Sequence, residues 1–171
     1  MDNKNFYNVV DDFIVRNSSS KTLAKTAFID DNKSISYENL FNNIKSFAYS
    51  LHKIGLKKSN RVLIILEDSI DFPIAFLGSI WGGVIPICIN TMLPENDYRY
   101  MIEDSEADAI IVSSSIYQTI KNAINKSKSK AKIIVSGNNI TSEISFNELL
   151  KEREIIEVAN TRLDDICLWM Y

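Results

Sequence analysis

Hydrophobic positions between residues 36 and 54 follow a helical period. Steps of four and three residues in turn separate the apolar side chains Leu40, Ile44, Phe47, Leu51 and Ile54. This spacing lines one face of a helix, so it predicts a helix over residues 36–54. Ser36 can cap the start of this helix, and Gly55 can end it in a left-handed conformation.

Two further elements are expected ahead of this helix. Residues 26–29 and 33–36 flank the turn-forming triplet Asp30-Asp31-Asn32, which predicts a short hairpin. Residues 5–16 are expected to form an opening helix. The first third of the chain is therefore predicted to contain a helix, a hairpin and a long amphipathic helix.

The pattern changes after residue 60 to short apolar runs rich in Val, Ile and Leu. The runs lack clean alternation, which is typical of strands covered on both faces, and they occupy residues 61–66, 84–89, 109–113 and 132–136. Helical stretches are expected between them, over residues 70–81, 95–105 and 116–126. Alternating strands and helices imply right-handed crossovers. The sequence therefore predicts an α/β fold with a mainly parallel sheet and helices on both faces.

Residues 72–93 contain no charged side chain, so they need to be weighed as a membrane span. The stretch is interrupted by Pro73, Gly82, Gly83 and Pro86, and its second half is β-branched. A buried helix followed by a buried strand explains it better than a membrane span. The Gly-rich end, residues 78–83, is expected to stop the helix and turn the chain into the strand.

The last third of the chain fits the same scheme. Residues 137–139 are expected to form a turn that ends a strand. Ser145 and Glu148 match a capping box, which predicts a short helix through about Arg153. Neither a repeat nor a convincing domain boundary is apparent, so residues 1–171 are predicted to form one domain.

The net charge of the chain bears on which kinds of molecule it can bind. The chain has 19 basic and 22 acidic side chains and a net charge of −3, which argues against a nucleic-acid partner held by phosphate neutralisation. The acidic side chains in the middle of the chain are expected to form a solvated helix face rather than a cation site, because their spacing is not that of a metal loop. They are Asp97, Glu103, Asp104, Glu106 and Asp108.

The cysteines and the single histidine limit the possible chemistry. Cys88 and Cys167 each lie among apolar neighbours and are expected to be buried free thiols in a reducing compartment. The amino terminus lacks the apolar core of a signal peptide, so a cytoplasmic location is expected. His52 falls in the last turn of a predicted helix, where it is interpreted as structural. One histidine supports neither a zinc site nor a Ser or Cys triad.

A phosphate-binding loop is also missing, because neither of the usual Gly-rich patterns occurs. Glu67 and Asp68 follow a predicted strand, and they are interpreted as a strand-to-helix connection with acids in the first helical turn. We therefore assign no residue of this chain a catalytic, cofactor-binding or metal-binding role.

The order of several short motifs resembles the opening of the adenylate-forming (AMP-binding) enzymes. These motifs are ISYENL at residues 35–40, GLKKSNRV at 55–62 and FLGSIWGGVIP at 76–86. Further segments are similar to the benzoate-coenzyme A ligase branch, namely NTML at 90–93, DYRYMIEDS at 97–105 and DDICLWMY at 164–171. The resemblance extends from about Ala27 to Tyr171.

This resemblance implies an ATP-dependent acyl- or aryl-CoA ligase that uses magnesium and coenzyme A and acts on a small carboxylate. In the family, a strand like residues 166–171 leads into a Ser/Thr/Gly-rich loop that holds the ATP phosphates. The resemblance further implies that the catalytic and ATP-binding segments follow Tyr171. None is therefore expected on this chain, and neither are bound cofactors. The rest of the enzyme is the expected partner, and a homodimer is compatible with the family.

The apolar run at residues 166–171 leaves two interpretations open. The chain is an amino-terminal subdomain that is inactive alone, or it is a naturally short, non-catalytic interaction domain derived from such an enzyme. Trp169 and Tyr171 are interpreted as core packing in the terminal strand rather than as a shelf for an aromatic substrate.

Overall fold

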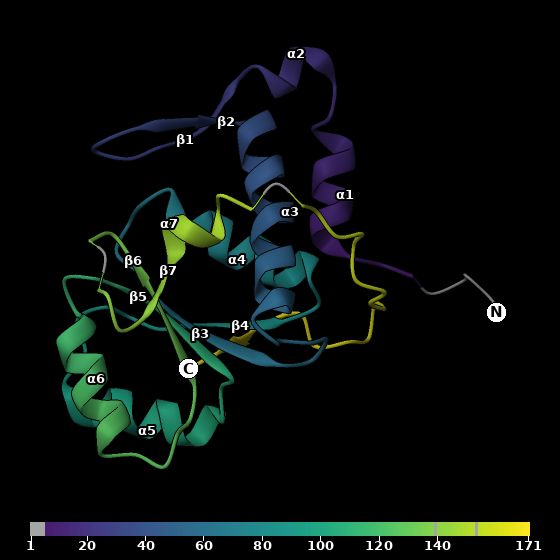
Figure 1. Cartoon of the computed structure of the whole chain (residues 1–171). Helices are drawn as coiled ribbons and strands as arrows, with labels where there is room; N and C mark the ends of the chain where they lie inside the picture. Colours follow the sequence, from purple (N-terminus) through teal and green to yellow (C-terminus); the bar gives the residue numbers. More distant parts are fainter. Residues whose placement is uncertain (1–5, 139, 153) are drawn as a thin grey trace.

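The computed structural model describes residues 6–138, 140–152 and 154–171. Six parallel strands form one sheet, and a separate two-stranded hairpin lies beside it (Figure 1). The strand order is β7-β6-β5-β3-β4-β8, and every pair in this sheet is parallel. These strands are β3 (Arg61–Ile65), β4 (Ile85–Cys88), β5 (Ala109–Ser113), β6 (Lys132–Ser136), β7 (Ile144–Ser145) and β8 (Trp169–Met170).

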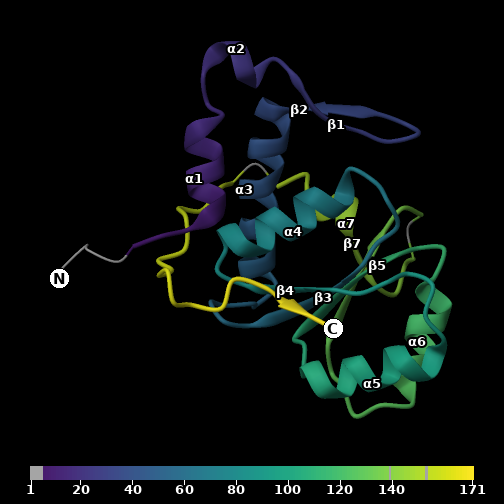
Figure 2. The same ribbon diagram turned by 180° about the vertical axis from the view of Figure 1, so that it is seen from behind.

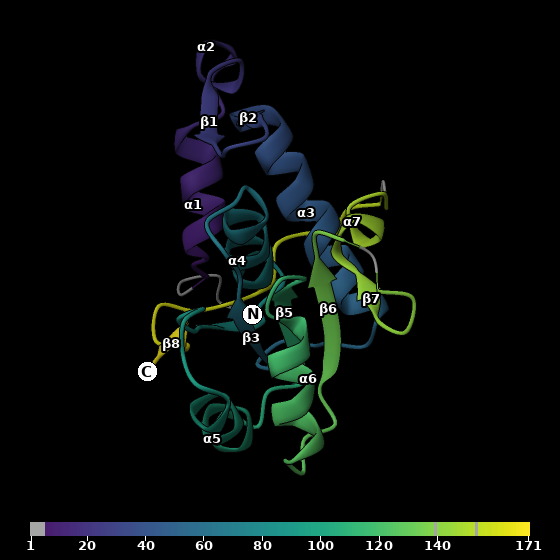
Figure 3. The ribbon, with the colours of Figure 1, turned by 90° about the vertical axis from the view of Figure 1, so that its left-hand side faces the viewer.

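Helices cover both faces of the sheet. The helices are α1 (Val9–Arg16), α2 (Ser20–Leu23), α3 (Tyr37–Lys53), α4 (Asp71–Trp81), α5 (Glu95–Ser105), α6 (Tyr117–Asn125) and α7 (Phe146–Leu149). Helices α1, α3 and α4 lie on one side of the sheet, and α5 and α6 lie on the other (Figure 3). The predicted α/β fold with a mainly parallel sheet is confirmed.

Successive residues of the central strands enter two different cores. Val62 and Ile64 pack with α3 and α4, whereas Leu63 and Ile65 pack with α5 and α6. Side chains of a strand point alternately to opposite faces, so a strand covered on both faces must be apolar throughout. This double burial explains why the strand runs lack an alternating polar pattern.

The long helix α3 begins and ends at the predicted signals. The Ser36 hydroxyl accepts a hydrogen bond from the Asn39 amide at 3.3 Å, and Gly55 has a φ of 101°. Helix α3 packs mainly against α4, which lies behind it in Figure 1 and in front of it in Figure 2. The uncharged stretch is α4 followed by β4, as predicted. In the described part of the chain, no helix combines the length and apolarity needed to cross a membrane.

Several predicted boundaries need correction. The opening helix begins at Val9, because the Asn8 side chain caps it by accepting from the Val10 and Asp11 amides. The capping-box helix ends at Leu149, short of the expected end at about Arg153. Arg153 and residue 5, the predicted start of the opening helix, both lie outside the described ranges. The hairpin is β1 (Thr26–Ile29) paired with β2 (Ser34–Ser36). Helix α2 and strand β7 were not expected from the sequence.

A strap without regular secondary structure joins α7 to β8. We use this name for residues 154–168, which cross the α1 and α4 side of the sheet (Figures 1 and 3). The Trp81 indole donates a hydrogen bond to the Ile156 carbonyl at 3.0 Å, and the Ala159 amide donates one to the Trp81 carbonyl at 2.9 Å. The strap therefore brings β8 to the sheet edge beside β4.

Candidate functional site at the carboxyl edge of the sheet

The parallel sheet brings the carboxyl ends of its strands to one edge. The chain leaves β3 toward β4 and leaves β5 toward β6, in opposite directions along the sheet. Open α/β sheets bind ligands outside the carboxyl ends of their strands, near such a reversal. The residues that follow β3, β4, β5, β6 and β8 are therefore the first place to look for a functional site.

Polar groups at the ends of β3, β5 and β6 bond to one another. The Ser113 hydroxyl accepts from the Glu67 amide at 2.9 Å, and the Ser136 hydroxyl donates to Oδ2 of Asp71 at 2.7 Å. Asp71 is only 6% exposed, and its Oδ1 lies 3.3 Å from Nζ of Lys33. A buried carboxylate is tolerated when it is bonded in this way. These polar groups bond to one another, so at this part of the carboxyl edge they hold the fold together and are not free to bind a ligand.

The β1–β2 hairpin covers the same part of the edge. Ile70 precedes α4 and gives the helix no side-chain cap, but its amide donates to Oδ2 of Asp30 at 3.0 Å. This bond, with those from the Asn32 and Lys33 amides, holds the pKa of Asp30 below its usual value. The end of β3 is therefore capped by another part of the chain.

At the carboxyl ends of β4 and β8, tyrosine hydroxyls donate hydrogen bonds. The Tyr98 hydroxyl donates to the Asn90 carbonyl at 3.0 Å, which fixes the turn after β4. Just after β8, the Tyr171 hydroxyl donates to Oδ2 of Asp104, in the last turn of α5, at 2.7 Å. Burial and this hydrogen bond raise the pKa of Tyr171, so the phenol keeps its proton at neutral pH. The candidate site is therefore the part of the edge where β8 ends beside β4.

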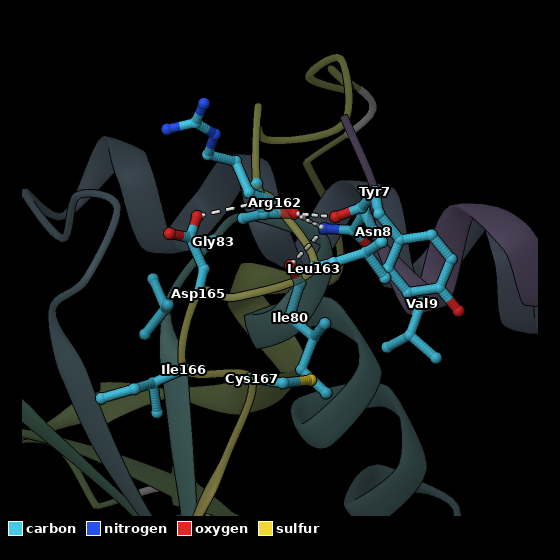
Figure 4. Close-up of a pocket in the computed structure, with 12 residues that line it drawn as sticks. Tyr7, Asn8, Val9, Ile80, Gly83, Arg162, Leu163, Asp165, Ile166 and Cys167 are labelled. Carbon is cyan, nitrogen blue, oxygen red and sulfur yellow. Dashed lines mark hydrogen bonds between the residues drawn. The ribbon is translucent and has the colours of Figure 1, made fainter. Parts of the chain in front are cut away.

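A cavity of about 250 Å³ lies at the opposite edge, where β4 begins (Figure 4). Its walls come from three parts of the chain: the start of α1, the α4–β4 turn and the strap. Ile80, Leu163 and Ile166 give it a largely apolar lining. Figure 4 shows the Arg162 guanidinium directed away from the other side chains drawn.

Polar side chains of this cavity serve structural contacts. The Asn8 Nδ2 donates to the Ile80 carbonyl at 2.9 Å and to the Thr161 hydroxyl at 3.2 Å. The Thr161 hydroxyl donates to the Tyr7 carbonyl at 2.7 Å, and Asp165 pairs with Lys58 at 2.8 Å. None of these contacts resembles a nucleophile beside a base. We interpret the cavity as a packing gap beneath the strap.

The two thiols are free, as predicted, but they are less buried than expected. Both cysteines are free, but Cys88 is half-buried and Cys167 is exposed. The expectation of two buried thiols is therefore wrong, because Cys167 lies in the strap, outside both cores, and Cys88 ends a strand near the sheet edge. Burial raises the pKa of the Cys88 thiol, and partial desolvation of its sulfur raises that of Cys167, which disfavours the nucleophilic thiolate at neutral pH.

The histidine and the acidic residues lie mostly where the sequence placed them. His52 is in the last turn of α3, and its Nε2 also lies 2.8 Å from the Gly82 carbonyl, a contact the sequence did not predict. Glu67 and Asp68 form the strand-to-helix connection, but the first-turn acid of α4 is Asp71. In the described ranges, no three His, Cys, Asp or Glu side chains come together as a metal site.

The predicted acidic helix face is present in part, and one of the two terminal aromatic side chains lies outside the core. Asp97, Glu103 and Asp104 are exposed on α5, as expected, whereas Glu106 caps the helix and Asp108 follows it. Trp169 is half-buried, but Tyr171 is 46% exposed. The core-packing interpretation is therefore wrong for Tyr171, which stacks on Trp169 outside the core with ring centroids 5.7 Å apart.

Sequence reasoning did not single out Asp71, Asn8 or the pairing of Asp104 with Tyr171. A signal existed for Asp71, because it directly precedes the uncharged stretch and opens a helix. Asn8 precedes an apolar helix, as an N-cap does. No local pattern relates Asp104 to Tyr171, which lies 67 positions away.

The chain is similar to known enzymes over most of its length. The profile of the AMP-binding enzyme family matches residues 15–171. Benzoate–CoA ligase of Thauera aromatica is 40% identical over 167 residues, which cover 96% of this chain and 31% of that enzyme. The 4-hydroxybenzoate–CoA/benzoate–CoA ligase of Rhodopseudomonas palustris is 34% identical over 166 residues, with the same coverage.

Solved structures agree with these matches. The crystal structure of a benzoate CoA ligase from Burkholderia xenovorans LB400 superposes with a TM-score of 0.88 and 31% identity, covering 96% of this chain and 32% of that one. A luciferase-like enzyme from Zophobas morio, at 18% identity and a TM-score of 0.85, shares the fold. The chain thus spans about a third of the length of these relatives and has the fold of their amino-terminal portion.

Proposed function

The chain belongs to the AMP-binding enzyme family, and on that premise we propose that it forms the amino-terminal part of an ATP-dependent aryl- or acyl-CoA ligase. The observation that carries the proposal is the 40% identity to a benzoate–CoA ligase over 96% of the chain. Similar identity to two benzoate-acting enzymes favours a small aromatic carboxylate as the substrate class. A cytoplasmic location is part of the same proposal.

The proposed reaction has two steps. The substrate carboxylate attacks the α-phosphate of ATP, which forms an acyl-adenylate and releases pyrophosphate. The coenzyme A thiolate then attacks the acyl carbonyl, which forms the thioester and releases AMP. Both steps develop charge on oxygen atoms that must be stabilised by preorganised donors or cations.

Residues 1–171 act in this proposal as one domain and a scaffold. The family relationship implies a phosphate loop after β8, so the parallel sheet and α4 would support that loop from beneath. The described residues contain no cluster that fits magnesium, and we assign none of them to that ion. The rest of the enzyme, and not this chain, would supply the groups that bind ATP, the carboxylate and coenzyme A.

Two measurements test this proposal. The native reading frame should continue beyond Tyr171 into a Gly/Ser/Thr-rich loop. The full-length enzyme should catalyse benzoate-dependent exchange of pyrophosphate into ATP, whereas the 171-residue chain should not. Robust exchange by the 171-residue chain would contradict the scaffold role. A stop codon after Tyr171 would instead favour a short, non-catalytic interaction domain.

A further inference from the structure

We propose that Asp104 is a positioning residue that fixes the carboxyl end of β8 through Tyr171. The inference rests on the proposed function, under which the segment after Tyr171 is the loop that holds the ATP phosphates. The direction in which β8 ends then sets the position of that loop. Helix α5 supplies the rigid support.

Strand β8 lies beside β4 in the sheet. It pairs with β4 at two positions, Ile87 with Trp169 and Cys88 with Met170. Backbone pairing sets the register of these residues, and the side chains of β8 and of Tyr171 can add contacts that fix the direction of the chain as it leaves the sheet.

Tyr171 makes those contacts with α5. Its hydroxyl donates to Oδ2 of Asp104 at 2.7 Å, a charge-assisted hydrogen bond. The ring of Tyr100, from the same helix, meets the Tyr171 ring edge-on, with centroids 6.5 Å apart and planes at 68°. Trp169 stacks against Tyr171 at 5.7 Å with planes at 27°. The end of β8 is thus held by its own aromatic pair and by two residues of α5.

The tryptophan is fixed in turn by Arg61 at the start of β3. The Arg61 guanidinium lies 5.9 Å from the Trp169 ring centroid, in a cation–π arrangement. The same guanidinium pairs with Glu106 at 3.3 Å, and Glu106 caps α5. A closed set of contacts therefore runs from α5 to β3, to β8 and back to α5.

Helix α5 is a firm support because its other face is buried. Tyr98 and Ile102 are 2% and 1% exposed and belong to the same core as Leu63 and Ile65 of β3. Asp104 lies on the exposed face of the same helix. Movement of Asp104 would require displacement of those buried side chains, which gives Tyr171 a fixed partner.

The test uses the full-length enzyme with ATP and benzoate. Asp104→Ala and Tyr171→Phe should each raise the KM for ATP about tenfold, since each removes the same charge-assisted hydrogen bond. The KM for benzoate should stay within twofold. The double variant should match either single variant, because both changes delete one interaction. Asp104→Asn keeps an acceptor oxygen and should restore most of the ATP affinity.

A second readout does not depend on activity. In the ATP-free enzyme, amide hydrogen exchange in the peptide containing Met170 and Tyr171 should accelerate in Asp104→Ala. Glu103→Ala is the matched control, because Glu103 is the adjacent exposed acid of α5 and pairs with Arg99 instead. Neither the KM for ATP nor the exchange rate should change in that variant.

The possible outcomes separate this inference from the proposed function. Unchanged KM for ATP in Asp104→Ala and Tyr171→Phe would overturn the positioning role, as would an equal rise in Glu103→Ala. If Asp104→Ala does not fold, Tyr171→Phe decides, because it removes a single oxygen atom. If the wild-type enzyme exchanges no pyrophosphate with any carboxylate, the proposed function fails, and the hydrogen-exchange comparison alone decides whether Asp104 fixes β8.

Discussion

Asp71 shows how a buried charge can serve the fold rather than chemistry. It accepts from the Ser136 hydroxyl and faces Lys33, and so ties α4 to β6 and to the hairpin. Asp71→Ala should destabilise the chain by about 2 kcal/mol, because a buried hydroxyl and an ammonium group lose their partner. Urea unfolding measures the change. Asp68→Ala, at an exposed position on the same connection, should alter stability by less than about 0.5 kcal/mol. Equal losses in both variants would contradict this account.

Ser105, unlike Asp71, carries a buried polar group that has no hydrogen-bond partner in the described part of the chain. Its side chain is fully buried at the end of α5, and among the described residues its hydroxyl is the buried side-chain oxygen without a hydrogen-bond partner. An unpaired buried hydroxyl costs about 1–3 kcal/mol. Ser105→Ala should therefore raise the free energy of unfolding by about 1 kcal/mol, since alanine also favours the helix. A loss of stability in urea unfolding would mean that the hydroxyl has a partner in solution.

The strap packs closely against Gly83, in the turn between α4 and β4. Gly83 has a φ of 73°, and a Cβ there would lie 2.9 Å from Cβ of Ala159. Gly55 has a φ of 101°, but a Cβ there would meet nothing within 4 Å. Gly55→Ala should thus cost about 1–2 kcal/mol for the backbone alone. Gly83→Ala should cost more, and adding Ala159→Gly should recover the difference. Equal thermal shifts for the two single alanine variants would disprove the strap contact.

Among the helices and strands, the sequence predicted those features that local rules determine. The helices and central strands were found within a few residues, because period, caps and glycine stops are encoded locally, as Ser36 and Gly55 demonstrate. The sequence did not predict the strap or β7, and it did not predict that Cys167 and Tyr171 are exposed. These depend on contacts between distant segments, such as Trp81 with Ile156, and no local pattern records them. The family resemblance supplied the function class, but the Asp104–Tyr171 pair required the structure.

For the whole molecule, the two ends of the chain depend on each other through Asn8. This side chain is 3% exposed, caps α1, and donates to the Ile80 carbonyl of α4 and to Thr161 of the strap. An isolated bridge between Phe6 and Arg162 lies next to it. One residue therefore joins the first helix, the α3–α4 layer and the strap that leads to β8. Its loss should loosen the strap as well as the helix.

Two substitutions separate these roles of Asn8. Asn8→Asp keeps the capping oxygen but loses the Nδ2 donor, and it places a carboxylate against the Ile80 carbonyl. If capping alone mattered, Asp would preserve stability, because aspartate is an equally good N-cap and favours the helix dipole. We expect instead a loss of about 2 kcal/mol or more in urea unfolding, since a buried acceptor is left unpaired. We also expect faster proteolysis within residues 154–168. Asn17→Ala is the control, because the side chain of Asn17, at the other end of α1, donates to the Phe13 carbonyl of the same helix at 2.8 Å and should leave cleavage of the strap unchanged. A stable Asn8→Asp variant with a protected strap would show that the chain ends are held without this contact.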